Sequence, residues 1–266
     1  MEENVPRGSI LVLFDYDWSL INTNSDTFVV EVLANDLKQY FKLYRNEGMG
    51  WTSLMDRQMQ NLHERGITPS DIEDCIANVP VQEGMLEAIQ LAARYGAVLH
   101  IISDANEVFI QSFLKRHGLE DLFAGVHTNI ARFSEEGRLS VQPYHHNDFC
   151  SMCPSNMCKG SIVRSILDEA QMEFSKIIYI GDGGGDYCPA TLLRNGDVLL
   201  ARASNEKDFG LIKMIRGDLG VDSSKTGEND QNGSESNASV IKADIVEWDL
   251  GSEVLNTFET IFCSHT

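Results

Sequence analysis

The chain has 266 residues, 42% of them hydrophobic, which is enough for one large domain or for a core domain that carries a smaller insert. Its 40 acidic and 21 basic side chains give a formal net charge of -19, which argues against nucleic acid or an anionic membrane as partner. No apolar run could span a bilayer, and the acidic first residues are unlike a targeting peptide. Six scattered cysteines are typical of reduced thiols, so we expect a cytoplasmic protein.

The first predicted element is a strand at residues 10–14, an apolar run typical of a parallel sheet that is covered on both faces. The run ends in Asp15 and Asp17, followed by Ser19. Two carboxylates beside an apolar wall are costly unless a cation or hydrogen bonds satisfy them. Residues 22–97 then show apolar positions at three- and four-residue spacing and no strand pattern, which predicts a helical block.

Strands and helices alternate through the rest of the chain. Buried strands are predicted at residues 98–102, 124–128, 176–180, 197–200 and 243–248. Helices are predicted at residues 108–117, 161–170 and near 188–194, and a β-hairpin at 132–141. Residues 217–242 are polar and acidic, which favours a disordered, solvated loop.

This alternation predicts an α/β fold with a doubly wound, Rossmann-like parallel sheet. Residues 1–21 and 98–266 would form the α/β core, and residues 22–97 an inserted helical cap above the strand ends. The sequence carries no signal for the oligomeric state.

Polar clusters follow three of the predicted strands: Asp15 with Asp17, Ser103 with Asp104, and Asp182 with Asp186. The carboxyl ends of parallel strands meet in one crevice, and Lys159 begins a helix near it. Carboxylates, hydroxyls and one lysine suit Mg²⁺, which pairs with substrate phosphate. A carboxylate can also be the nucleophile in phosphoryl transfer, with a neighbouring carboxylic acid moving the proton.

Four sequence blocks carry a family resemblance: Asp15-Tyr16-Asp17-Trp18-Ser19, Ser103-Asp104, Lys159, and Gly181-Asp182-Gly183-Gly184-Gly185-Asp186. In this order they resemble the motifs of haloacid-dehalogenase-type phosphatases. The segments Cys153-Pro154-Ser155-Asn156-Met157-Cys158-Lys159 and Asp186-Tyr187-Cys188-Pro189 are similar to one branch, the phosphoethanolamine/phosphocholine phosphatase-like group with its plant pyrophosphatase and thiamine-phosphate-phosphatase-like relatives. The resemblance covers most of the chain outside residues 217–242.

The resemblance implies catalytic roles for four residues. Asp15 is expected to be the nucleophile that forms an aspartyl-phosphate, and Asp17 the acid and base. Ser103 is expected to bind the phosphoryl oxygens. Lys159 would neutralise nucleophile and phosphate, unless it is a solvated surface lysine.

Metal and substrate residues are implied in the same way. The expected Mg²⁺ site comprises Asp15, Asp17, Asp182 and Asp186. Asp186 could instead only cap a helix. Asp26 and Asp104 match positions implicated in substrate binding, where acids suit a cationic or amine-bearing leaving group, although Asp26 could equally be a helix cap. Trp18 is bulkier than usual for the family, and Ser19 replaces a threonine.

A cysteine-rich loop allows a zinc hypothesis. Its candidate ligands are Cys150, Cys153, Cys158, His145 and His146, but no second well-spaced pair completes a site. The alternative is a thiol-bearing loop that positions Lys159.

The predicted function is a Mg²⁺-dependent phosphatase that acts on a small phosphorylated metabolite, with no nucleic acid or membrane partner. Two alternatives remain open. One is a phosphotransferase or mutase, which would transfer phosphate to an acceptor. The other is a binding or regulatory protein that has kept the fold without turnover.

Overall fold

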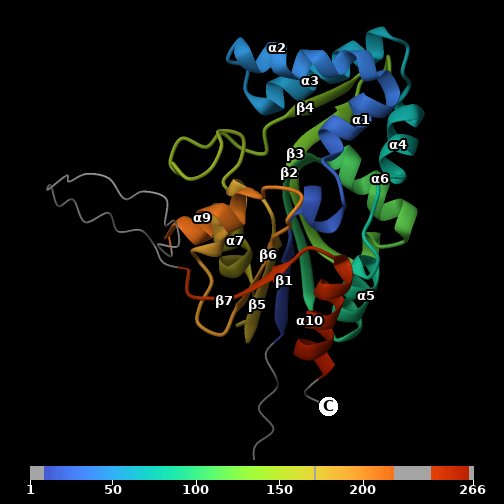
Figure 1. Ribbon diagram of the computed structural model, residues 1–266. Helices are drawn as coiled ribbons and strands as arrows, with labels where there is room; N and C mark the ends of the chain where they lie inside the picture. Colours follow the sequence, from blue (N-terminus) through green and yellow to red (C-terminus); the bar gives the residue numbers. More distant parts are fainter. Residues whose placement is uncertain (1–8, 171, 219–240, 264–266) are drawn as a thin grey trace, which may run out of the picture.

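The computed structural model describes residues 9–170, 172–218 and 241–263, and its centre is one seven-stranded sheet (Figure 1). The strands are β1 (Ile10–Phe14), β2 (Val98–Asn106), β3 (Phe123–Phe133), β4 (Leu139–Gln142), β5 (Lys176–Gly181), β6 (Val198–Arg202) and β7 (Asp244–Trp248). Their order in the sheet is β4-β3-β2-β1-β5-β6-β7. All neighbours pair in parallel except β3 and β4, which form an antiparallel hairpin.

Helices connect and cover these strands. The longer ones are α1 (Ser25–Ala34), α2 (Gln39–Asn46), α3 (Trp51–Glu64), α4 (Pro69–Ala77), α5 (Met85–Arg94), α6 (Glu107–His117), α7 (Lys159–Glu169), α9 (Gly210–Asp218) and α10 (Gly251–Cys263). The shorter ones are η1 (Tyr16–Leu20), η2 (Asn35–Lys38), η3 (Glu120–Leu122), η4 (Gly184–Asp186) and α8 (Tyr187–Ala190). The fold is therefore α/β and Rossmann-like, as predicted.

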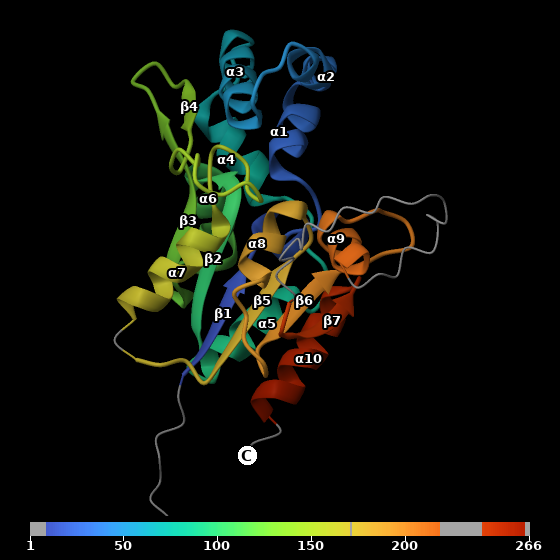
Figure 2. The same ribbon diagram turned by 90° about the vertical axis from the view of Figure 1, so that its left-hand side faces the viewer.

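The position of β1 at the centre of the sheet explains why apolar and polar residues do not alternate along it. Successive strand residues point to opposite faces of the sheet. Val12 and Phe14 are fully buried in one core, with residues of α5, α6 and α10, and Leu11 and Leu13 are fully buried in the other, with residues of α7, α8 and α9. Figure 2 shows α7, α8 and α9 on the face turned to the viewer. Both faces need apolar side chains, so the run is continuous.

Helices α1 to α4 lie beyond the carboxyl ends of the strands, whereas α5 lies lower, beside α10 (Figure 1). Gly84 and Gly251 allow the first turns of α5 and α10 to touch. A Cβ atom on Gly84, which has φ +90°, would lie 2.8 Å from Ser252 Cα. The helices of residues 22–97 thus occupy two places, and the division of the chain into core and cap stays a prediction.

The predicted strands and the hairpin are confirmed, and β2 and β3 run several residues further than expected. Helices α9 and α10 were not predicted. Residues 217–242 fall almost entirely outside the described ranges. Among the helices of the described ranges, none has the length and apolar character needed to cross a bilayer.

Candidate active site

Asp15 is the residue that ends the central strand. Its side chain caps the turn η1: Oδ1 accepts the Tyr16 backbone N–H at 2.7 Å and lies 2.9 Å from Lys159 Nζ. Burial, and then the charge of Asp186, raises the pKa of Asp15 well above its ordinary value, while Lys159 opposes the rise. Both contacts use Oδ1, and none of the described residues donates a hydrogen bond to Oδ2, so this oxygen is available to a ligand.

The turn after Asp15 brings Asp17 to the same place. Trp18 within it has φ 58°, a left-handed conformation that costs energy for a side chain of this size. Arg202 Nη1 donates to the Trp18 carbonyl at 2.6 Å and so helps to hold the turn.

Asn24 and Ser25, at the start of α1, orient the Asp17 carboxylate. Asn24 Nδ2 donates to Oδ2 and the Ser25 N–H donates to Oδ1, each at 2.9 Å. Burial raises the pKa of Asp17 to about 7, although the hydrogen bonds from Ser25 lower it. A pKa near neutrality suits a group that must both give and take a proton.

Asp186 is completely buried, and both of its oxygens are engaged. Oδ1 accepts from Lys159 Nζ at 2.7 Å and from Tyr179 Oη at 2.8 Å. Oδ2 accepts the backbone N–H groups of Asp182 and Gly183, at 3.1 and 2.9 Å. Asp186 therefore fixes both the lysine and the loop that follows β5.

Lys159 begins α7 and lies between Asp15 and Asp186. It is only 4% exposed. Burial alone would lower its pKa, but the carboxylates of Asp15 and Asp186 outweigh this effect and raise it. The ammonium therefore stays charged, and the alternative of a solvated surface lysine is wrong.

Asp182 completes the acidic cluster. Ser19 Oγ donates to its Oδ1 at 3.4 Å. Burial, and then Asp186, raises the pKa of Asp182 to about 8. Ligand oxygens of Asp15, Asp182 and Asp186 lie within 4.8 Å of one another, a spacing and donor type that fit one hard divalent cation.

A cavity of about 220 Å³ opens at this cluster. The predicted site residues that line it are Asp15, Asp17, Asp104, Lys159, Asp182 and Asp186. Trp18 lines it as well. The cavity is smaller than a typical drug-sized site, which favours a small ligand.

Two predicted residues lie behind this lining. Ser103 is fully buried, and its Oγ accepts the Ala105 N–H at 3.3 Å. Asp26 is also buried, in the first turn of α1, where its Oδ2 accepts from Trp51 Nε1 at 2.6 Å. The cap of α1 is Asn24, whose side chain accepts the Thr27 N–H, so the alternative that Asp26 caps this helix is wrong.

Two cations near Trp18 were missed by the sequence analysis. Lys207 Nζ lies 2.8 Å from the centroid of the Trp18 ring, and burial lowers its pKa to about 8. Arg202 binds the Trp18 carbonyl and also donates to Asn22 Oδ1 at 2.7 Å. Neither belongs to a recognisable motif, so only the packing of remote segments reveals them.

The candidate zinc ligands do not all lie together in the structure. The thiols of Cys150, Cys153 and Cys158 lie together, and a fourth, Cys188, joins them from α8. His145 Nε2 instead accepts the Cys158 backbone N–H at 2.9 Å, and in the described ranges no metal cluster includes a histidine.

Comparisons with known proteins identify the family of this chain. A family model described as "Putative Phosphatase" matches residues 10–261. The chain belongs to this family. It is 33% identical over 252 residues to a thiamine phosphate phosphatase-like protein of Arabidopsis thaliana, which covers 92% of each chain. It is 31% identical over 255 residues to the pyridoxal phosphate phosphatase PHOSPHO2 of Mus musculus, which covers 93% of this chain and 96% of the mouse protein.

A solved structure supports the fold. A substrate-bound phosphoserine phosphatase matches with a TM-score of 0.51 and 12% identity, over 80% of this chain and 99% of that one. The family and its named relatives make this protein a phosphoric monoester hydrolase, and its fold is that of the haloacid-dehalogenase-type phosphatases. The expectation of an enzyme is confirmed.

Proposed function

We propose that this phosphatase depends on Mg²⁺ and hydrolyses a small phosphomonoester, or a pyrophosphate-like metabolite, through an aspartyl-phosphate on Asp15. The observation that carries the proposal is the buried contact of Lys159 Nζ with Asp15 Oδ1, at 2.9 Å, in a cavity lined by further acids. A buried carboxylate beside a buried ammonium is a nucleophile whose repulsion of an anionic phosphate is already reduced.

In the proposed reaction Asp15 attacks phosphorus, the bond to the leaving oxygen breaks, and Asp17 gives that oxygen its proton. Asp17, now ionised, takes a proton from the water that attacks the aspartyl-phosphate, which releases phosphate and restores Asp15. The raised pKa of Asp17, about 7, supports this exchange of roles. Lys159 offsets the negative charge, and the Ser103 hydroxyl donates a hydrogen bond to a phosphoryl oxygen.

The cation is proposed because the acids outnumber the lysine. Asp15, Asp17, Asp182 and Asp186 are all at most 9% exposed, and buried charge of one sign must be compensated. A bound Mg²⁺ would supply that compensation and polarise the phosphoryl group. Asp186 already spends both oxygens on protein donors, so we propose Asp15 and Asp182 as direct ligands, with the backbone carbonyl of Asp17, and Asp186 as their support.

We propose a leaving group that is cationic or carries an amine. Asp104 lines the cavity. Burial raises the pKa of Asp26, and the charges of Asp17 and Asp104 are near enough to raise it further, so the leaving-group side is acidic. Trp18 adds an aromatic wall. Thiamine phosphate and pyridoxal phosphate, which the names of two relatives contain, are small phosphomonoesters with aromatic nitrogen rings.

The direct test is Asp15→Asn, assayed by phosphate release from p-nitrophenyl phosphate with Mg²⁺. The amide keeps the shape of the carboxylate and is a far weaker nucleophile, so we expect kcat to fall by at least about 10³-fold. The matched control is Asp36→Asn, because Asp36 pairs with Arg65 at the surface. An unchanged kcat in Asp15→Asn, with a normal circular dichroism spectrum, would overturn the mechanism.

Substrate and cation are tested together with a panel of choline, ethanolamine, thiamine and pyridoxal phosphates and pyrophosphate, each with Mg²⁺ and with EDTA. Selective turnover that requires Mg²⁺ supports the proposal. Transfer to an added alcohol without release of phosphate would show the alternative, a phosphotransferase. The proposed cytoplasmic location is tested by cell fractionation.

A further inference from the structure

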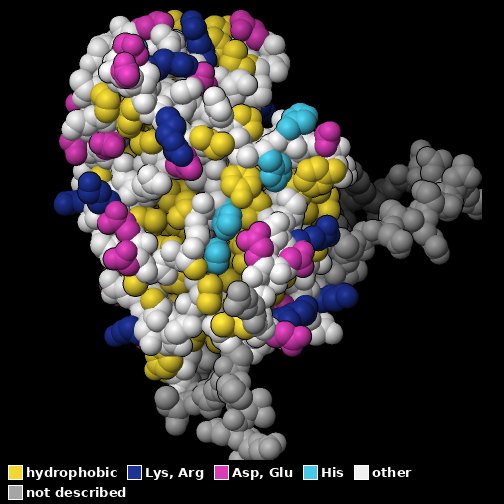
Figure 3. Space-filling model, turned by 180° about the vertical axis from the view of Figure 1, so that it is seen from behind, with side chains coloured by type: hydrophobic (Ala, Val, Ile, Leu, Met, Phe, Trp, Pro, Cys, Tyr) yellow, Lys and Arg dark blue, Asp and Glu magenta, His cyan; other side chains and the backbone are white. Residues whose placement is uncertain are grey.

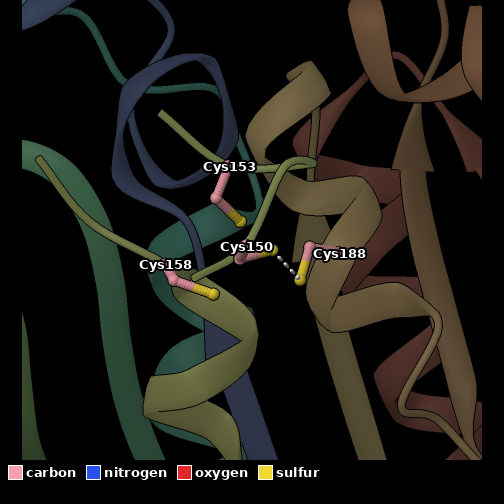
Figure 4. Close-up of side chains that lie close together, drawn as sticks. All are labelled: Cys150, Cys153, Cys158 and Cys188. Carbon is pink, nitrogen blue, oxygen red and sulfur yellow. Dashed lines mark hydrogen bonds between the residues drawn. The ribbon is translucent and has the colours of Figure 1, made fainter. Parts of the chain in front are cut away.

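Four cysteine thiols meet beside the active site, from two segments far apart in the sequence (Figure 4). Cys150, Cys153 and Cys158 belong to the loop before α7, and Cys188 lies on α8. All four Sγ atoms lie within 4.8 Å of one another, and Figure 4 shows them turned toward a common centre.

The spacing of the sulfurs matches a single tetrahedral ion. A Zn–S bond is about 2.3 Å long, so the edges of a tetrahedral ZnS₄ unit measure about 3.8 Å. Cys150 Sγ and Cys188 Sγ are 3.7 Å apart. A disulfide needs about 2.05 Å, so this pair is not one. Four thiolates within 4.8 Å of one another select zinc among the common divalent cations.

A buried asparagine helps to hold the surrounding loop in this arrangement. Asn147 is buried, and its Nδ2 donates to the carbonyls of Cys150, Cys153 and Pro154 at 3.0 to 3.2 Å. Its Oδ1 accepts the Cys150 N–H at 3.1 Å. One side chain thus fixes the Cys-x-x-Cys turn.

Gly160, the residue after Lys159, packs directly against the thiol of Cys188. A Cβ atom on Gly160 would lie 2.5 Å from Cys188 Sγ, so any larger residue would push Cys188 away from the loop. The absence of a side chain at this position therefore allows the close approach of the two segments.

We propose that Cys150, Cys153, Cys158 and Cys188 bind one structural Zn²⁺, which joins the loop before Lys159 to the helix after Asp186. Cys158 directly precedes Lys159, and Cys188 follows Asp186 by two residues, while Lys159 Nζ and Asp186 Oδ1 form a 2.7 Å ion pair. Pro154 and Met157 of the same loop line the active-site cavity. The ion would hold the lysine, its acidic partner and one wall of the cavity in register.

The experiment measures metal content and not activity, so it is independent of the proposed reaction. The full chain is purified under reducing conditions from zinc-supplemented cells and its metals are counted by mass spectrometry. We expect about one zinc per chain in the wild type and in the control Cys75→Ser, which lies in α4. Cys150→Ser should bind zinc at least about tenfold more weakly, because changes behind a metal ligand already cost that much.

A second measurement covers variants that fold poorly. Co²⁺ bound to the unaltered chain should show thiolate-to-cobalt charge transfer and the strong visible bands of tetrahedral coordination, and a mercurial thiol reagent should release zinc. Equal zinc in Cys150→Ser and Cys75→Ser, no tetrahedral cobalt spectrum, or iron in place of zinc would each overturn the proposal.

Discussion

Asp15 and Asp17 lie two residues apart, yet different groups hold them. Asp15 faces the ammonium of Lys159 at 2.9 Å, whereas Asp17 receives two neutral hydrogen bonds from the start of α1. A charged partner favours the ionised form of a carboxyl group, and burial favours the protonated form. Lys159 therefore favours the carboxylate at position 15, against the burial that raises the pKa of Asp15, whereas the buried and neutral surroundings of Asp17 favour a proton donor.

The substitution Asp17→Asn should separate these two roles. The amide cannot protonate a leaving group, so we expect kcat to fall by about 10²- to 10⁴-fold for an alkyl phosphate. The leaving group of p-nitrophenyl phosphate needs little protonation. For this ester the rate of phosphoryl transfer to Asp15 should therefore fall much less. Steady-state rates for both esters, with burst kinetics for the aryl ester, measure the difference. An equal loss for both esters in every step would contradict the role of Asp17 as general acid.

Much of the site was predictable because the carboxyl ends of parallel strands lie at one edge of a sheet. Buried apolar runs that stop at Asp15, Ser103 and Asp182 place polar groups at one edge of a parallel sheet, and the structure has them there. Trp18 and its partner Arg202 are 184 positions apart, and their contact depends on packing that local patterns do not encode. Cys188 was missed for the same reason.

Helix α10 was missed although a signal was present. Val254, Phe258 and Phe262 recur every four residues and are buried in the core with β1. Helix α9 has a shorter apolar pattern, and the polar residues 217–242 begin at its end. Its sequence therefore predicts a helix less clearly.

Strands β2 and β3 place two histidines face to face. His100 Nδ1 lies 3.1 Å from His127 Nε2, and the rings stack with centroids 5.3 Å apart. His127 also contacts Tyr144; burial lowers the pKa of His127, and the charge of Glu169 partly opposes this effect. Figure 3 shows histidine side chains in a row on this face of the molecule. Burial, and then His127, lowers the pKa of His100 to about 4 from an ordinary value of 6.5.

This pair predicts a loss of stability in acid. Below pH 6.5 the unfolded chain binds a proton at His100 that the folded chain does not, so stability falls as the pH drops from 6.5 toward 4. Because the ring is partly exposed, we expect the loss by pH 5 to be about 1 kcal/mol. Urea unfolding at pH 7 and pH 5 should show a smaller loss in His100→Gln than in His146→Gln, a control at an exposed position. Equal losses would refute the prediction.

The helices above the sheet are joined to it through Asp56 in α3. Its carboxylate lies 2.6 Å from Arg138 Nη2 and accepts from Ser140 Oγ at 3.2 Å and from the Val141 N–H at 2.9 Å. These contacts connect α3 to the β3–β4 hairpin at the edge of the sheet. An acid that no catalytic motif contains thus links α3 to the edge of the sheet.

Removal of this carboxylate in Asp56→Ala should loosen the hairpin. We expect a local cost of about 1–3 kcal/mol, because the Arg138 and Val141 donors lose their acceptor. Amide exchange of β4, followed by mass spectrometry, should then be about tenfold faster or more. The control is Glu64→Ala, at the C-terminal end of α3, where the exposed carboxylate accepts from Gln60 of the same helix. Unchanged exchange in β4 would show that Asp56 does not secure the hairpin.

The adjacency of the thiol cluster and the acidic cluster changes how inhibition by chelators should be read. Cys158 directly precedes Lys159, which pairs with Asp15 and Asp186 of the acidic cluster, and Cys188 follows Asp186 by two residues. A hard ion bound at the cavity as proposed would exchange readily, whereas a zinc ion enclosed by the four sulfurs would leave slowly and its loss would loosen the surrounding loop. Brief EDTA treatment should thus be reversed at once by Mg²⁺. Prolonged treatment should produce a second, slower inactivation that only zinc repairs.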